Sequence, residues 1–203
     1  MSLTDQQGRE VVVLARETLE GFVRGGRPRA PGTWPQEHFN QKRGVFVTLK
    51  DHDDSLRGCT GLPYPVKALG DAVIEATVGA AAQDPRFPAV SERELSGILV
   101  ETSILTVPRL LDVPRRVDLP MNVRVGVDGL IVSTDGVSGL LLPQVASELR
   151  LSPEEFLSET CMKAGLPPDS WLEEQTFVQV FQAEIFGEES PRGTIVRNTA
   201  QEG

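Results

Sequence analysis

A cysteine beside a fixed positive charge and between two glycines occurs in the segment LRGCTG, residues 56–61. Arginine stabilises a thiolate, and the thiolate is the nucleophilic form of cysteine. If this segment is a strand, Arg57 and Cys59 lie two residues apart and face the same side. The spacing therefore makes Cys59 a candidate catalytic nucleophile. The alternative is a small apolar residue packed inside a sheet, where free cysteines usually lie.

The same segment has a second interpretation as a ligand-binding site made of Arg57, Gly58, Thr60 and Gly61. A guanidinium group offers a planar fork to a carboxylate or phosphate, and backbone N–H groups around glycine can add further donors. The alternative is that the glycines serve a β-bulge and that Arg57 pairs with one of the chain's 29 acidic residues.

Two further charged residues, Asp84 and Arg86, lie in the proline-rich loop DPRFP at residues 84–88. The loop follows a predicted helix that ends in small residues, so both side chains could line the same ligand site. The alternative is a local ion pair between them. Cys161 lies between leucines of a later predicted helix and is expected in the core.

The chain offers few metal ligands. It contains two cysteines and two histidines, His38 and His52, with no Cys-x-x-Cys pair and no histidines at helical i, i+4 spacing. We therefore expect neither a metal site nor a cofactor.

The overall composition limits the partners. The 203 residues carry 20 basic and 29 acidic side chains, a formal charge of -9. This balance argues against bulk nucleic-acid binding, which depends on cationic surface. The sequence has no apolar run of the length that spans a membrane, and residues 1–5 do not resemble a signal peptide. We expect a cytoplasmic protein without membrane contact.

Local patterns predict the elements that position the motif. A capping box at Thr4 and Gln7 begins a helix of about five turns, which ends at Gly25. The β-branched and aromatic run at 44–50 and the return from Leu56 form a hairpin, so LRGCTG lies on its second arm. A helix from Pro65 to Val78 and a strand at 98–106 follow.

The second half of the chain is also predicted to alternate strands and helices. We expect a hairpin of 123–127 and 130–132 across the Asp128–Gly129 turn, a second turn at 133–136, and a helix that begins at Ser152. A long strand over 175–186 is followed by a disordered tail over 187–203. Together these elements give an α+β fold, mostly antiparallel, in one compact unit.

Five segments in register carry a resemblance to a known family. They are LRGCTG at 56–61, DPRFP at 84–88, ETSILTVP at 101–108, GLLLPQVA at 139–146 and FLSETCMKAGLPPDSW at 156–171. In these segments the chain resembles the AMMECR domain family, named for the Alport, midface hypoplasia and elliptocytosis chromosomal region. Thr60 stands where the family usually has isoleucine, and Ala89 where a second proline often follows.

The resemblance implies a single AMMECR-type domain over residues 1–186, with flanking helices and two unequal lobes separated by a groove near LRGCTG. Family members occur beside Memo-type and radical-SAM proteins, and the family has no established activity. We expect the groove to bind a small anionic or nucleotide-like ligand, with Cys59 either as the nucleophile of an enzyme or as part of the floor. The alternative is a non-catalytic scaffold that binds a peptide or partner protein. The sequence leaves open whether the protein is an enzyme, and its oligomeric state.

Overall fold

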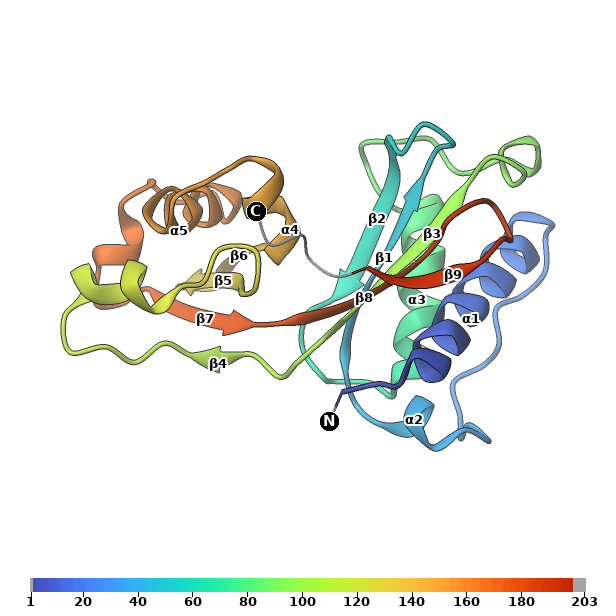
Figure 1. Cartoon of the computed structure of the whole chain (residues 1–203), viewed down its shortest axis with the longest axis horizontal. Coiled ribbons are helices and arrows are strands. Elements are labelled where there is room, and N and C mark those ends of the chain that lie inside the picture. Colours follow the sequence, from blue (N-terminus) through green and yellow to red (C-terminus); the bar gives the residue numbers. More distant parts are fainter. Residues whose placement is uncertain (1, 199–203) are drawn as a thin grey trace. The chain divides into compact units, whose positions relative to one another are not determined.

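The computed structural model describes residues 2–198 (Figure 1). Within this range the chain divides into two compact units. Unit 1 comprises residues 2–105 and 184–198, and unit 2 comprises residues 106–183. The chain thus leaves unit 1 once and returns to it for its last strands.

Unit 1 is built on a five-stranded sheet with the strand order β2-β1-β3-β8-β9. Its strands are β1 (Gly44–Lys50), β2 (Leu56–Leu62), β3 (Leu99–Leu105), β8 (Ala183–Glu188) and β9 (Ile195–Asn198). The central β1 pairs antiparallel with both β2 and β3. The LRGCTG motif occupies most of β2, which is an edge strand, so one of its edges is not covered by a neighbouring strand.

Two helices, α1 (Asp5–Val23) and α3 (Leu69–Ala82), pack against this sheet and against each other (Figure 1). The predicted capping box is confirmed, because Thr4 Oγ1 accepts from the Gln7 N–H while the Gln7 side chain accepts from the Thr4 N–H. Gly25 follows the helix with a φ of 81°. α1 therefore begins and ends at the predicted signals. The short helices α2 (Glu37–Asn40) and η1 (Glu92–Glu94) complete the helices of unit 1 within the described residues.

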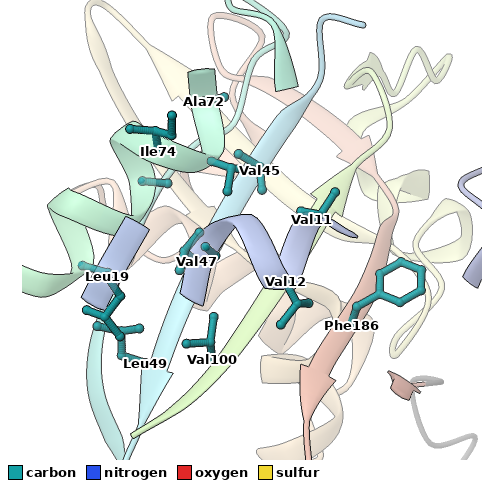
Figure 2. Close-up of a cluster of buried hydrophobic side chains, with 14 of the residues drawn as sticks. Val11, Val12, Leu19, Val45, Val47, Leu49, Ala72, Ile74, Val100 and Phe186 are labelled. Atoms are coloured by element: carbon teal, nitrogen blue, oxygen red, sulfur yellow. The ribbon is translucent and has the colours of Figure 1, made fainter. Parts of the chain in front are cut away.

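The core of unit 1 lies between the sheet and these helices (Figure 2). In β1, Val45, Val47 and Leu49 are fully buried and belong to this core. Because side chains alternate along a strand, Phe46, Thr48 and Lys50 face the opposite side of the sheet. Cys59 is the partner of Thr48 in the β1–β2 register, so the thiol also lies on the face turned away from the helices.

Unit 2 contains a four-stranded sheet with the order β4-β7-β5-β6. Its strands are β4 (Arg109–Leu110), β5 (Gly129–Thr134), β6 (Val137–Leu141) and β7 (Phe177–Phe181). Its helical elements are η2 (Arg116–Asn122), α4 (Pro143–Glu148), α5 (Pro153–Lys163) and η3 (Ser170–Leu172). α5 begins at the predicted Ser152, whose side chain forms a capping box with Glu155. Cys161 is fully buried in the core of this unit, as expected.

Three predictions for the second half of the chain are wrong. The predicted turn at 133–136 is present between β5 and β6, but no hairpin forms across Asp128–Gly129, where Asp128 is buried and binds the backbone and side chain of Arg124. The long strand over 175–186 divides at Gln182 into β7 and β8, which belong to different sheets.

The predicted tail begins too early. β8 continues to Glu188 and β9 pairs with it antiparallel, so residues 195–198 are ordered by backbone hydrogen bonds rather than by an apolar pattern. Residues 199–203 of the predicted tail lie outside the described range.

The α+β class with antiparallel sheets is confirmed. Across residues 2–198, no helix combines the length and the apolar character that crossing a membrane requires.

Candidate functional site

Arg57 does not lie beside Cys59 as strand alternation predicts. The β1–β2 register pairs Leu49 with Gly58 but Lys50 with Leu56, so Arg57 is the extra residue of a β-bulge. A bulge reorients the side chains next to it. The Arg57 side chain instead donates from Nε to Glu94 Oε1 at 2.7 Å and from Nη2 to the Pro88 carbonyl at 3.0 Å.

This Arg57–Glu94 pair is largely enclosed. The Arg57 side chain is 9% exposed and that of Glu94 34%. The side-chain hydrogen bond from Arg57, with further bonds from Ser91, lowers the pKa of Glu94 to about 2. Arg57 Nη1 is buried without a hydrogen-bond partner among residues 2–198. Arg57 therefore fastens the edge strand to the segment after α3 through two of its five guanidinium N–H groups.

Asp84 is the residue that connects the loop to the motif. Its Oδ2 accepts the backbone N–H of Cys59 at 2.9 Å, on the open edge of β2. Arg86 donates to the same carboxylate from Nε at 2.9 Å and from Nη2 at 2.6 Å. The hydrogen bonds from Arg86, followed by the one from Cys59, hold the pKa of Asp84 far below its usual range. The expected local ion pair is thus present, and it also contacts the cysteine backbone.

The two members of this pair differ sharply in exposure. The Asp84 side chain is 3% exposed, whereas that of Arg86 is 52% exposed. Asp84 occupies the Nε–Nη2 edge of the guanidinium group, and Nη1 has no hydrogen-bond partner within the described part of the chain. Arg86 therefore presents an oriented positive charge to solvent directly beside the cysteine.

The Cys59 thiol is only partly accessible. Thr48 Oγ1 donates to its sulfur at 3.4 Å. Burial is the main effect and raises the pKa of Cys59, while the hydrogen bond from Thr48 and the charge of Arg86 lower it, and the Asp84 and Glu101 carboxylates add a smaller rise. The thiol is consequently protonated at neutral pH and is a weaker nucleophile than an ordinary free cysteine.

The glycines of the motif have a packing role. A Cβ atom at Gly58 would lie 2.2 Å from the carbonyl oxygen of Ala80 in α3, and one at Gly61 would lie 2.4 Å from the Val45 carbonyl. Thr60 packs against α3, since a Cβ at Gly79 would lie 2.7 Å from its methyl group. At Gly58, the absent side chain therefore makes room for the main chain of α3.

The sequence interpretation missed Glu101, which lies across the sheet from the thiol. In the registers, Thr48 pairs with Cys59 on one side and with Glu101 on the other. Lys50 Nζ approaches Glu101 Oε2 at 3.4 Å, and the Asn198 side-chain amide donates to the same oxygen at 3.1 Å. Only the strand order reveals this neighbourhood, because β1 separates the two residues. Nowhere in residues 2–198 do three His, Cys, Asp or Glu side chains gather closely enough to hold a metal ion.

The fold and motif arrangement match a defined protein family. The AMMECR1 family model matches residues 12–186, which include all of residues 106–183 of unit 2, most of unit 1 and the whole motif region. The chain therefore belongs to the AMMECR1 family.

Its similarity to individual members extends over nearly the whole chain. It is 52% identical over 188 residues to a protein of Methanothermobacter thermautotrophicus, covering 92% of this chain and 97% of that protein. It is 48% identical over 199 residues to a protein of Thermococcus onnurineus, covering 96% and 97% of the two chains. The crystal structure of the uncharacterized protein PH0010 from Pyrococcus horikoshii matches with a TM-score of 0.92 at 45% identity, over 97% of this chain and 98% of that one.

Proposed function

We propose that the protein binds a small anionic ligand at the open edge of β2, with Arg86 as the cationic contact and Cys59 as a neutral thiol beside it. The observation that carries the proposal is a half-exposed guanidinium group, that of Arg86, which the buried carboxylate of Asp84 holds in one orientation beside the Phe87 ring. A hydrogen-bond donor whose orientation is already fixed loses less conformational entropy on binding a carboxylate or phosphate than a freely rotating side chain does.

The surroundings of Arg86 favour a ligand that has an apolar part as well as an anionic group. The Phe87 ring lies 5.5 Å from Arg86 Cζ, so an aromatic surface adjoins the charge. A ring of the ligand could lie against Phe87 while its phosphate contacts Nη1. These features support a nucleotide-like ligand over a bare inorganic ion, and the raised pKa of Cys59 supports a lining role for the thiol rather than a covalent step.

The test is isothermal titration of the protein with inorganic phosphate and with AMP as probes. We expect both to bind, AMP more tightly, and Arg86→Gln to weaken both by about tenfold or more because a charge-assisted hydrogen bond is lost. Arg86→Lys keeps a cation beside Asp84 and serves as the folded variant that lacks the planar fork.

Unit 2 provides a matched control. Arg124 binds Asp128 through the same two nitrogens, and the two side chains are 60% and 2% exposed. Arg124→Gln should therefore leave both affinities unchanged. Equal effects of the Arg86 and Arg124 substitutions, or no binding of either probe, would refute the proposal.

A further inference from the structure

A concave surface lies on unit 1, along the outer side of α1. It is a groove of about 910 Å³ whose floor is a stripe of α1 residues from Gln6 to Phe22. One wall is the segment that runs back along α1 after its C-terminus (Figure 1), and the other includes residues 193–195. None of the candidate site residues around Cys59 lines it. The groove is therefore separate from the proposed anion site.

The shape of this groove is elongated. The floor covers sixteen helical steps, which corresponds to about 24 Å at 1.5 Å per residue. Its apolar lining includes Val13, 43% exposed, and the buried Trp34 and Phe39. Near one end lies Gly21, where a Cβ atom would meet nothing within 4 Å. A long floor with an exposed valine in its middle suits a peptide segment, which can contact it over several turns or extended residues.

The charges around the groove indicate what such a peptide would carry. Three arginines line it, Arg9, Arg27 and Arg29. Among residues 2–198, none of these three lies within ion-pair distance of a carboxylate, and Arg29 stacks on the Trp34 ring at 3.8 Å. Two acids, Glu10 and Glu17, also line the groove, and Glu10 Oε2 lies 3.3 Å from His38 Nε2. Unpaired cations around an apolar floor are complementary to acidic residues that flank an apolar stripe.

We propose that this groove is a docking site for a peptide segment of a partner protein whose apolar residues are flanked by aspartate or glutamate. The apolar residues of the peptide contact Val13 and the aromatic wall. Its acidic residues pair with Arg9 at one part of the groove and with Arg27 and Arg29 at another. The small Gly21 lets the peptide backbone approach α1 closely.

The experiment is a selection from a displayed library of random peptides about 16 residues long, the helical length that spans the floor. The full chain is the target, and the affinity of enriched peptides is measured by fluorescence anisotropy. We expect enriched peptides to combine spaced apolar residues with acidic ones and to bind less tightly as salt increases.

Two variants test the location. Gly21→Glu blocks the groove without an internal clash and replaces a poor helix former, and Arg9→Glu reverses one charge. Each should weaken binding about tenfold or more. Gly97→Glu and Arg93→Glu introduce the same charges in unit 1 but outside the groove lining, and they should leave the affinity unchanged.

The proposal is wrong if no peptide is enriched, if the enriched peptides are basic or lack acidic residues, or if the groove variants bind as tightly as their controls.

Discussion

Replacing Glu94 by alanine removes the carboxylate that faces the buried guanidinium group of Arg57. The pKa of Glu94 lies at about 2, below its ordinary 4.5. At 1.36 kcal/mol per pH unit this difference corresponds to at most ~3 kcal/mol. Because a third of the Glu94 side chain is exposed, solvent screening reduces the combined contribution of its bonds to Arg57 and Ser91 to about 2 kcal/mol.

The substitution also removes a cap. Glu94 Oε2 accepts from the backbone N–H and the hydroxyl of Ser91, and losing a cap of this kind costs about 1 kcal/mol. These cap bonds already contribute to the lowered pKa, so we expect Glu94→Ala to lower the free energy of unfolding of unit 1 by about 2 kcal/mol in all. Ser91→Ala, which removes only the hydroxyl side of the cap, should cost about 1 kcal/mol.

The assay uses the fact that the chain has two tryptophans, Trp34 in unit 1 and Trp171 in unit 2. In a Trp171→Phe background, urea unfolding followed by Trp34 fluorescence reports unit 1. A double-mutant cycle with Arg57→Met, which retains much of the apolar stem, isolates the pair. The coupling energy between positions 57 and 94 should be about 1 kcal/mol at neutral pH, because the Ser91 cap accounts for the rest.

The pH dependence of this coupling has a definite sign. Because the pKa of Glu94 is lower in the folded state, its stabilisation is fully present above pH 4.5 and is lost as the pH falls toward about 2. A coupling energy below about 0.5 kcal/mol at neutral pH would refute the structural role assigned to Arg57. Arg57 would then be available to bind a ligand, as the sequence motif alone suggests.

Three further results are expected. Asp84→Asn should lower the stability of unit 1 by about 2–4 kcal/mol, since it breaks a buried pair and its backbone hydrogen bonds, whereas Asp128→Asn should leave the unit 1 transition unchanged. In a Cys161→Ser background, alkylation of Cys59 should show a midpoint above about 8.5, because burial raises the pKa of the thiol; a midpoint near neutrality would contradict this. Gly58→Ala should lower the melting temperature through a cost of about 1–3 kcal/mol, because its Cβ collides with the main chain of α3, and an unchanged melting temperature would exclude that close contact.

The sequence predicted those parts of the fold that depend on neighbouring residues. The capping boxes at Thr4 and Ser152 could be identified because each involves residues three positions apart. The arms of the β1–β2 hairpin were also predictable from their β-branched and aromatic composition.

Two of the failures, the long strand and the early tail, have a common physical cause in long-range pairing. The strand predicted over 175–186 has a continuous alternating pattern, but Gln182 binds the backbone and side chain of Thr106, and the strand changes sheets there. The order of β9 depends on its hydrogen bonds with β8. Neither interaction leaves a signal in the local sequence.

The sequence identified the residues of the candidate site better than it predicted their arrangement in space. The motif and the DPRFP loop were both identified, but the hydrogen bond from Cys59 N to Asp84 connects residues 25 positions apart. Strand alternation also assigned Arg57 to the wrong neighbour, because a single bulge residue changes the side on which a side chain emerges. The position of Glu101 required the full order of the sheet.

The most direct test of the anion site is a ¹H–¹⁵N titration of the protein with phosphate, matched against chloride at equal ionic strength to cancel screening. The Cys59 amide donates to Asp84, which holds Arg86, so anion binding at Arg86 should shift the Cys59 amide signal and the Arg86 Nε–H signal together and saturably. Arg124 should serve as the internal reference and stay unchanged. If the Arg86 and Cys59 signals respond no more than that of Arg124, the edge of β2 is not an anion site.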